Sequence, residues 1–216
     1  MFVVVTTLAS TARVGDLLTA MQDVTLLILA GGAGRRMEGQ DKAWLEINGQ
    51  PLIEILLTSL RPQCAQILIS ANRNIEKFSA LGAPVVTDEH YRGAGPLAGI
   101  YNALAHCTTP NLITVAVDTP GIPANYVSRF MRVRTAETRI LVAHDGVRTH
   151  PACALLASDL RASLGDFLQT GGRRVQDWQH KFNPQWVDFS DAPDSCYNIN
   201  TPDDLAHAIQ HFGARA

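Results

Sequence analysis

Short apolar runs rich in β-branched residues alternate with helix-patterned segments along most of the 216-residue chain. The candidate strands are TLLILA, AQILISA, APVVTD and NLITVAVD, and candidate helices such as PLIEILLTSL, IEKFSAL and PLAGIYNALAHC separate them. This alternation predicts repeated βαβ units. The first and last of these strands are almost entirely apolar, which predicts burial on both faces, as in a parallel sheet between two layers of helices. We therefore expect an α/β, three-layer Rossmann-like fold with a mostly parallel central sheet.

The second half of the chain departs from this alternation. Two strand-like runs flank Asp145 and Gly146, an Asp-Gly pair typical of a hairpin turn. An antiparallel hairpin near residues 139–157 would make the sheet mixed. The segment DLRASLGDFLQTGG is predicted to form a helix that ends at Gly171 and Gly172, and QWVDFS a last strand.

The segment NINTPDDLAHAI contains the sequence features of a helix start. Thr201 is a suitable N-cap, and Pro202 is a suitable first helical residue. Asp203 and Asp204 then place negative charge near the positive end of the helix dipole. A final helix is therefore expected to begin at about Pro202.

We expect a single domain over residues 21–216. Residues 1–20 precede the first strand, and their apolar patch lacks the positive region that begins a signal peptide. Met21 stands shortly before that strand. Residues 1–20 are therefore interpreted as a weakly ordered N-terminal extension or as an artefact of the assigned start site.

Charge and cysteine content favour a cytoplasmic protein. The formal net charge of −2 gives no bulk electrostatic reason to bind nucleic acid or a membrane surface. No apolar stretch approaches the roughly 20 residues needed to span a bilayer. The four cysteines are scattered without disulfide or zinc-finger spacing, so a reducing compartment is the simplest expectation.

The segment LAGGAGRRMEGQDK, residues 29–42, follows the first strand and combines glycines with basic residues. It matches neither the Walker motif, which ends in Gly-Lys-Ser/Thr, nor the dinucleotide fingerprint, because Met37 stands where a third glycine is needed. Glycines at a strand end nevertheless let backbone N–H groups approach a triphosphate closely. Arg36 and Lys42 would neutralise such phosphates. The alternative is a surface turn with solvated charges.

Acidic residues follow two further strands. Asp118 ends NLITVAVD, which brings its carboxylate to the same edge of the sheet as the glycine loop, where a hard oxygen ligand would hold Mg²⁺. Asp88 follows PVVT and could accept hydrogen bonds from a base or a sugar. The alternative for a lone aspartate at a strand end is a cap or a turn former.

Glycine and asparagine motifs provide weaker candidates. In RGAGPLAGI, Gly95 and Gly99 lie at a helix start and would admit a flat ring or a second phosphate. Alternatively, Gly99 only allows the helix to pack closely on the sheet. In YNIN, Asn198 and Asn200 supply amide carbonyls that can ligate Mg²⁺ or hold a substrate, although asparagine before a helix is commonly a turn former.

Other features of the sequence narrow the chemistry. His144 and His150 lack a third ligand at metal spacing, which disfavours zinc. Arg173 and Arg174 could hold an anionic substrate or simply be solvated. The sequence contains no GxSxG elbow and no recognisable cysteine nucleophile, which favours direct in-line transfer over a covalent enzyme intermediate.

Taken together, these segments resemble a known family. LAGGAGRRM followed by DKAWLEINGQPL is similar to the signature of nucleotidyltransferases that activate sugars and related phosphates. The ordered set LAGG, DK, ANR, GPLAG, DTP, HPACAL and NINTPDDL resembles the MobA family of molybdenum cofactor guanylyltransferases, from about Leu26 to His211. The resemblance implies the nucleotidyltransferase version of the expected fold and a Mg²⁺-dependent enzyme.

The resemblance also implies roles for individual residues. Asp118 would be the Mg²⁺ ligand, and Lys42, Arg36 and Asp118 would be catalytic. Relatives commonly have asparagine at the position of Ser70, and serine loses the paired donor and acceptor of an amide, which Asn72 could replace. The implied nucleotide-binding residues are Leu29, Ala30, Gly31, Gly32, Lys42, Ser70, Asp88 and Asp118. The residues implied to hold the pterin substrate or the metal are Arg36, Gly95, Gly99, Asn198 and Asn200.

The reaction implied by the resemblance is attack by the terminal phosphate of molybdopterin, or of molybdenum-molybdopterin, on the α-phosphorus of GTP, with release of pyrophosphate. This nucleophile is already anionic at neutral pH, so positioning and charge neutralisation by Mg²⁺, Lys42 and Arg36 would suffice. Other cofactor-biosynthesis proteins and recipient molybdoenzymes are further implied partners. Two alternatives stay open: a cytidylyltransferase or sugar-phosphate nucleotidyltransferase, and a non-catalytic pterin or nucleotide carrier.

Overall fold

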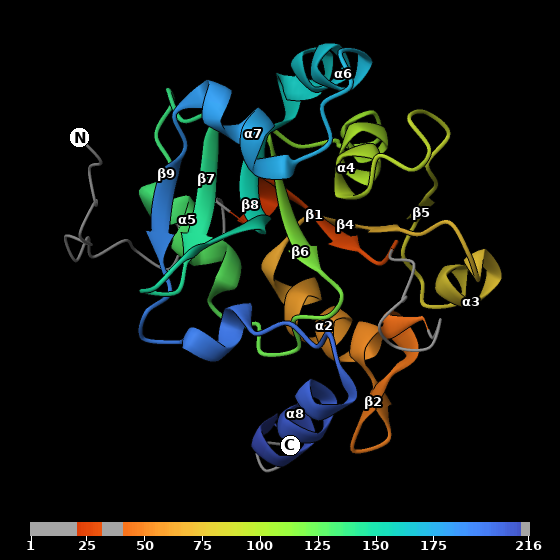
Figure 1. Cartoon of the computed structure of the whole chain (residues 1–216). Coiled ribbons are helices and arrows are strands. Elements are labelled where there is room, and N and C mark those ends of the chain that lie inside the picture. Colours follow the sequence, from red (N-terminus) through yellow and green to blue (C-terminus); the bar gives the residue numbers. More distant parts are fainter. Residues whose placement is uncertain (1–20, 32–40, 213–216) are drawn as a thin grey trace.

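The computed structural model describes residues 21–31 and 41–212 (Figure 1). The predicted N-terminal extension, together with Gly32 and Arg36 of the glycine loop, lies outside the described residues. Within them, seven strands form one sheet in the order β5-β4-β1-β6-β8-β7-β9. The strands are β1 (Val24–Leu29), β4 (Gln66–Ser70), β5 (Val85–Val86), β6 (Asn111–Ala116), β7 (Ile140–His144), β8 (Thr149–Ala157) and β9 (Gln185–Asp188).

The sheet is mixed, as the sequence predicted. Strands β5, β4, β1 and β6 pair in parallel with one another, and so do β7 and β9. Strand β8 runs antiparallel to both of its neighbours, β6 and β7. The mostly parallel sheet and the antiparallel hairpin near residues 139–157 are therefore confirmed.

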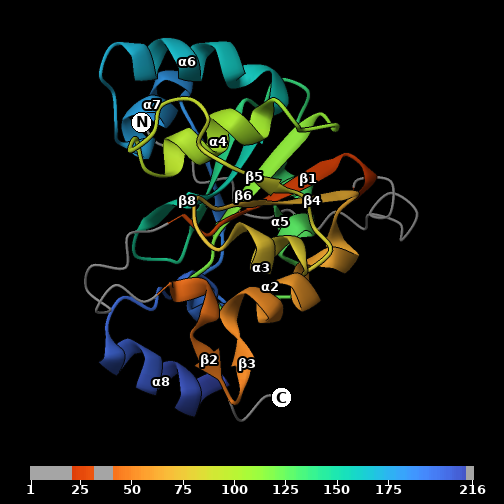
Figure 2. The ribbon, with the colours of Figure 1, turned by 90° about the vertical axis from the view of Figure 1, so that its right-hand side faces the viewer.

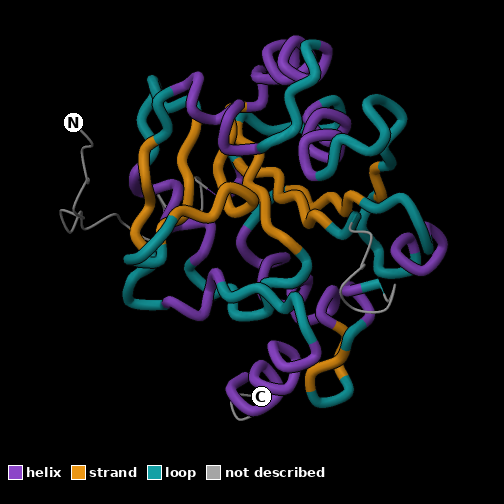
Figure 3. Tube along the Cα trace, viewed as in Figure 1, coloured by secondary structure: helices purple, strands orange, loops and turns teal. Residues whose placement is uncertain are grey.

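Helices cover both faces of the sheet and give three layers (Figures 2 and 3). Helices α2, α3 and α5 pack on one face, and α4, α6 and α7 on the other. Helix α8 packs instead against the small β2–β3 hairpin. No helix in the described part of the chain is long and apolar enough to cross a membrane. The bounds are α2 (Leu52–Leu60), α3 (Ile75–Ser79), α4 (Pro96–Leu104), α5 (Tyr126–Val133), α6 (Arg161–Gln169), α7 (Val175–Gln179), α8 (Pro202–Phe212), β2 (Glu46–Ile47) and β3 (Gln50–Pro51).

Alternate side chains of the central strands enter two different cores. In β1, Leu26 and Ile28 are buried with α2, α3 and α5, whereas Leu27 is buried with α4 and α6. In β6, Ile113 and Leu112 repeat this division. Successive residues of a strand face opposite sides of the sheet, so a strand with helices on both sides must be apolar throughout. The burial on both faces that the apolar runs predicted is confirmed.

Turns and helix ends also follow their local sequence features. The turn between β7 and β8 contains Asp145 and Gly146, and Gly146 has φ +94°. Helix α6 ends just before Gly171, whose φ is +86°. At the start of α8, the Asp204 N–H donates to Thr201 Oγ1 at 3.1 Å, which is the expected N-cap contact.

Three short elements lie outside the expected pattern. Helix α5 buries Tyr126, Val127 and Phe130, and polar residues such as Ser128 and Arg129 interrupt its apolar pattern. Helix α7 is one short turn that buries Trp178. The β2–β3 hairpin turns at Asn48 and Gly49, which have φ +52° and +79°. An Asn-Gly pair favours such a turn, but two-residue strands are too short to show an alternating pattern.

Candidate active site

The carboxyl ends of β4, β1 and β6 meet at one edge of the sheet. Leu29, the last residue of β1, lies in register with Ser70 on one side and Ala116 on the other. Pairing continues one step further, because the Ala30 N–H donates to the Ser70 carbonyl at 2.9 Å and the Val117 N–H to the Leu29 carbonyl at 3.1 Å. The segments that follow the three strands therefore leave the sheet side by side.

Lys42 reaches this edge from a short 3₁₀ helix, Lys42–Trp44, directly after the glycine loop. Its Nζ donates to Asp118 Oδ2 at 2.6 Å and to Asn200 Oδ1 at 2.8 Å. The side chains of Lys42 and Asp118 are 19% and 14% exposed, so the ion pair is open to solvent on one side. Lys42 therefore links the end of β6 to the segment before α8.

The burial of Ile199 determines how the side chains of Asn198 and Asn200, on either side of it, are oriented. Ile199 is fully buried in the small core beneath the β2–β3 hairpin, and its N–H donates to the Asp118 carbonyl at 2.9 Å. The flanking side chains point the other way, and Asn198 Nδ2 donates to Asp118 Oδ1 at 2.8 Å. We call the resulting group the Lys42 cluster; it consists of Lys42, Asp118, Asn198 and Asn200.

Asn72 and Asp88, which follow β4 and β5, form a second polar site that we call the Asp88 pair. Asn72 Nδ2 donates to Asp88 Oδ2, and Asn72 Oδ1 accepts the Asp88 backbone N–H, both at 2.8 Å. A Cβ placed on Gly31 would lie 3.5 Å from Asn72 Nδ2. The Asp88 pair is thus adjacent to the start of the glycine loop.

One carboxylate oxygen of the Asp88 pair has no hydrogen-bond partner within the described parts of the chain. Asp88 Oδ1 is buried, and the whole residue is only 7% exposed. Burial raises the pKa of this carboxyl, whereas the hydrogen bond from Asn72 and the charge of Arg92 oppose that rise. Buried polar atoms in native proteins are normally hydrogen-bonded. Asp88 Oδ1 is therefore suited to accept an N–H group from a ligand.

Two predicted site residues form a packing contact between α4 and β4. Ser70 is buried, and a Cβ on Gly99 would overlap its Oγ. Only glycine allows the helix to approach the strand this closely, which favours the packing role left open for Gly99. Gly95 precedes α4 with φ +65°, and a Cβ there would meet nothing within 4 Å. The positive φ at this position favours glycine, which explains Gly95 without a ligand. The substrate contacts of Gly95 and Gly99 stay predictions.

The core of the chain matches a known domain family. Residues 26–182, which include Lys42, Asp88 and Asp118, match the MobA-like NTP transferase domain. The chain belongs to this family. Relatives include the proteins named molybdenum cofactor guanylyltransferase in Shewanella loihica and Vibrio cholerae, each 40% identical over 192 residues. These alignments cover 87% and 89% of this chain, and 98% and 92% of the two relatives.

Solved structures share the fold of this MobA-like chain. The crystal structure of molybdopterin-guanine dinucleotide biosynthesis protein A from Archaeoglobus fulgidus gives a TM-score of 0.76 at 25% identity, covering 89% of this chain and all of that one. The 2-C-methyl-D-erythritol 4-phosphate cytidylyltransferase from Thermus thermophilus gives 0.66 at 18% identity, covering 88% of this chain and 98% of that one, a likeness of fold alone. The predicted nucleotidyltransferase fold and the resemblance to the MobA family are confirmed.

Other candidate side chains of the MobA-like domain are engaged in structural contacts. His150 Nε2 lies 2.6 Å from Asp145 Oδ2, and His144 Nδ1 accepts a backbone N–H of the β7–β8 turn at 3.0 Å. Arg173 donates to backbone carbonyls at the end of α6, at 3.1 and 2.7 Å. These contacts hold the hairpin and the end of α6 in place. Arg174 is the N-cap residue of α7 by its backbone position, and its side chain makes no capping hydrogen bond.

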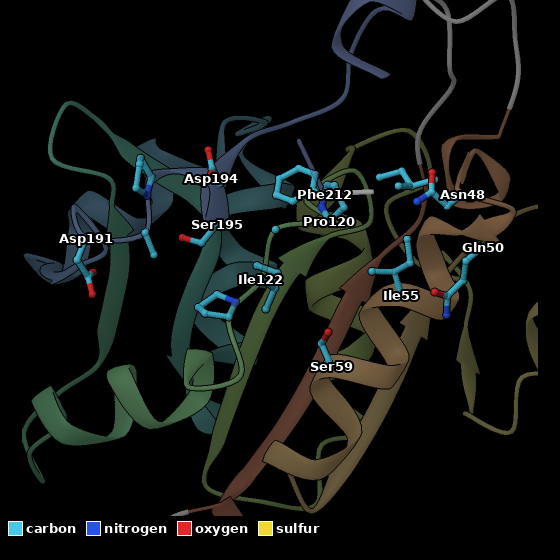
Figure 4. Close-up of a pocket in the computed structure, with 15 residues that line it drawn as sticks. Asn48, Gln50, Ile55, Ser59, Pro120, Ile122, Asp191, Asp194, Ser195 and Phe212 are labelled. Atoms are coloured by element: carbon cyan, nitrogen blue, oxygen red, sulfur yellow. The ribbon is translucent and has the colours of Figure 1, made fainter. Parts of the chain in front are cut away.

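A cavity of about 570 Å³ adjoins the loop that contains Asp118 (Figure 4). One wall contains Asp194 and Ser195, and the opposite wall contains Asn48 and Gln50. Its lining does not include the four side chains of the Lys42 cluster. The cavity is thus a separate hollow beside the cluster.

Two contacts of the site were missed in the sequence. The first is the pair of hydrogen bonds between Asn72 and Asp88, which no local pattern indicates because the residues lie 16 positions apart. The second is the contact of Asp204 with the backbone of Asn200. The Thr201-x-x-Asp204 spacing of a capping box could have indicated that the acid reaches back before the helix.

Proposed function

We propose that this protein transfers the guanylyl group of GTP to the terminal phosphate of molybdopterin, with or without bound molybdenum, and releases pyrophosphate. The product would be molybdopterin guanine dinucleotide. Membership of the MobA-like family supports the proposal, as do the names of the guanylyltransferases that align along nearly their whole length. The main structural support is the Lys42 cluster.

The Lys42 cluster brings an ammonium, a carboxylate and two amides together from three distant segments. It lies at the carboxyl edge of the sheet, where open α/β folds bind their ligands. A fixed positive charge at this edge can stabilise the charge that develops on phosphate oxygens during transfer. The phosphate nucleophile needs no strong base, so the task of Lys42, and of Arg36 in our proposal, is positioning and charge neutralisation.

Mg²⁺ is the proposed cofactor, and the donor set fits it. Magnesium prefers hard oxygen ligands. The Asp118 carboxylate and the Asn200 amide oxygen already converge on one cation, the Lys42 ammonium. Asp118, with Asn200 beside it, would hold the ion, which when bound neutralises phosphate charge. The hydrogen bond from Asn198 to Asp118 Oδ1 keeps the carboxylate oriented for this task.

The Asp88 pair is proposed to recognise the base. Guanine offers a ring N–H and an exocyclic amino group on one edge, and an unpartnered carboxylate oxygen can accept from such donors. Asp88 Oδ1 is buried in this state, and Asn72 fixes the other oxygen. The strand-end residues Leu29, Ala30, Gly31, Gly32 and Ser70 complete the proposed nucleotide site.

The experiment that tests the proposed function supplies the protein with molybdopterin, Mg²⁺ and one α-labelled nucleoside triphosphate at a time, and a parallel reaction contains a sugar phosphate in place of molybdopterin. We expect label from GTP to appear in the pterin product together with an equal amount of pyrophosphate. Incorporation of CMP in place of GMP would identify a cytidylyltransferase. Transfer to the sugar phosphate would identify a sugar-phosphate nucleotidyltransferase, and tight binding without release of pyrophosphate would identify a carrier.

We extend the proposal to the setting of the reaction. Cys64, Cys107, Cys153 and Cys196 are all free thiols, which suits the reducing cytoplasm. The product would be consumed by proteins that insert a pterin dinucleotide, so other cofactor-biosynthesis proteins and recipient molybdoenzymes are the proposed partners. Copurification of the labelled product with an apo-molybdoenzyme would test this extension.

A further inference from the structure

Asp204 ties together both ends of the segment that supplies Asn198 and Asn200. Its Oδ1 accepts a hydrogen bond from Tyr197 Oη at 3.0 Å. Its Oδ2 accepts the backbone N–H groups of Asn200 at 2.9 Å and Thr201 at 2.8 Å. One carboxylate therefore contacts the residue before the two asparagines, the second asparagine itself and the residue after it.

The tied segment is the part of the backbone that builds half of the Lys42 cluster. Asn198 holds Asp118 Oδ1, and Asn200 accepts from Lys42 Nζ. Between them, Ile199 is fixed both by burial and by its hydrogen bond to the Asp118 carbonyl. If the segment rotated about Ile199, both amides would leave their partners. The Asp204 contacts oppose such a rotation, because they lie on both sides of Ile199.

Asp204 is itself held in place by hydrogen bonds, so it can restrain the segment 197–201. Its own N–H donates to Thr201 Oγ1, so the contact between the first turn of α8 and the segment is reciprocal. Its hydrogen bonds, above all the one from the Asn200 N–H, lower the pKa of its carboxyl. The group is therefore an anionic acceptor at neutral pH, and hydrogen bonds to a charged acceptor are the stronger kind.

We propose that Asp204 is a positioning residue for the transfer reaction, acting through the 197–201 segment on Asn198 and Asn200 and so on Asp118 and Lys42. This inference rests on the proposed function. Asp204 need not touch substrate for this role. Residues that orient the groups in direct contact with a ligand typically contribute about 10- to 100-fold to activity.

The test compares Asp204→Asn with Asp203→Asn. Each substitution removes one negative charge from the first turn of α8, but only Asp204 makes the three contacts. Asp204→Asn should lower kcat about tenfold while the KM for GTP changes less than about twofold. Asp203→Asn should leave both unchanged. Tyr197→Phe, which removes one of the three contacts, should have an intermediate effect.

A second measurement is independent of turnover. The Asn198 side-chain amide, observed by nuclear magnetic resonance, reports its hydrogen bond to Asp118 directly. Asp204→Asn should shift or broaden this resonance, and Asp203→Asn should not. Thermal unfolding establishes that both variants are folded; if Asp204→Asn is not, Tyr197→Phe carries the same two measurements. An unchanged Asn198 resonance, or equal kcat values in the matched pair, would overturn the proposal.

The two proposals fail in different ways. If the wild-type protein transfers no GMP, the proposed function is wrong, and the Asn198 resonance still decides whether Asp204 places the segment. If the wild type transfers GMP and Asp204→Asn behaves like Asp203→Asn, the function stands and the positioning role is wrong.

Discussion

The Lys42 cluster and the Asp88 pair lie at the same edge of the sheet but differ in how many of their carboxylate oxygens accept hydrogen bonds from described residues. In the Lys42 cluster, both oxygens of Asp118 accept hydrogen bonds from described residues, one from Lys42 and one from Asn198. In the Asp88 pair, one oxygen is held by Asn72 and the other is buried without a hydrogen-bond partner among residues 21–31 and 41–212. Among the described residues, the Asp118 carboxylate therefore has a donor on each oxygen, whereas the Asp88 carboxylate has a donor on one oxygen.

This difference suggests that the two sites have different roles in the proposed reaction. A partly exposed ion pair can exchange partners at little cost, because water and incoming phosphate oxygens can replace a carboxylate beside an ammonium. A buried acceptor without a partner gains most from a ligand that donates to it and loses most from one that does not. The Lys42 cluster should therefore govern the rate of transfer, and the Asp88 pair the choice of nucleotide.

The largest effect is expected for Lys42→Ala. It removes the proposed positive charge at the reacting phosphates and the hydrogen bond that Asp118 Oδ2 accepts from Lys42. We expect kcat to fall roughly 100- to 1,000-fold, the usual loss for a preorganised charge-stabilising group. Single-turnover kinetics with labelled GTP would measure it. Lys77→Ala, which removes a surface lysine near Trp44, is the matched control and should leave kcat unchanged. Near-normal turnover of Lys42→Ala would remove the distinction between the two sites.

Asp88→Asn should affect nucleotide binding rather than the rate. The substitution places an amide where a buried acceptor stands, and an N–H group facing an N–H group of the base cannot form a hydrogen bond. We expect the KM for GTP to rise about tenfold, the loss of one buried hydrogen bond, with kcat nearly unchanged. Glu89→Gln, at the exposed neighbouring position, is the control.

ITP sharpens the Asp88 test, because hypoxanthine lacks the 2-amino group of guanine. The wild type should discriminate against ITP if Asp88 accepts from that group, and Asp88→Asn should treat the two nucleotides alike. Equal loss of both substrates in the variant would show that Asp88 reads the ring N–H instead.

A smaller effect, visible mainly in the pH profile, is expected for Asn72→Ala. The hydrogen bond from Asn72 lowers the pKa of Asp88 against the rise that burial causes, so its removal should raise that pKa further. Because GTP needs the ionised carboxylate, kcat/KM falls as the pH drops through this pKa. The acid limb of the kcat/KM profile for GTP should therefore move to higher pH in the variant. Adding Asp88→Asn to the same chain should abolish the shift.

The single residues of the Lys42 cluster were predictable because each stands at a local landmark. Asp118 follows the apolar strand β6, which ends at Ala116, and Asn198 and Asn200 precede a well-marked helix start. The shared sheet edge of Asp118 and the glycine loop was predicted, but the direct contacts among the four side chains were not predictable from those landmarks. Lys42 contacts partners 76 and 158 positions away, and the contacts depend on the register of β1 with β6 and on the burial of Ile199.

Prediction of the fold was limited in the same way: local sequence patterns predicted elements, but not the features that depend on tertiary contacts. The apolar runs and the Asp-Gly turn were enough to predict the three layers and the β7–β8 hairpin, because both follow from local periodicity. Helix α5 was not predicted. Its buried residues Tyr126, Val127 and Phe130 are recognisable as one face of a helix only once their packing against the sheet is known. The Asp88 pair was not predicted for a related reason. Its hydrogen bonds join segments that follow β4 and β5, and the pairing of these strands depends on tertiary structure.

The smallest effect on activity is expected for Gly99→Ala, which separates packing from nucleotide binding. The added Cβ would overlap Ser70 Oγ and lie 3.1 Å from Ser70 Cβ, so α4 must move away from β4. Overpacking of this kind costs about 1–3 kcal/mol of unfolding free energy, measurable by urea titration. Ser70→Gly should relieve the overlap, so the two substitutions should be strongly non-additive in a double-mutant cycle. If instead Gly99→Ala raised the KM for GTP as much as Asp88→Asn does, with unfolding free energy unchanged, Gly99 would belong to the nucleotide site and not to the packing beneath it.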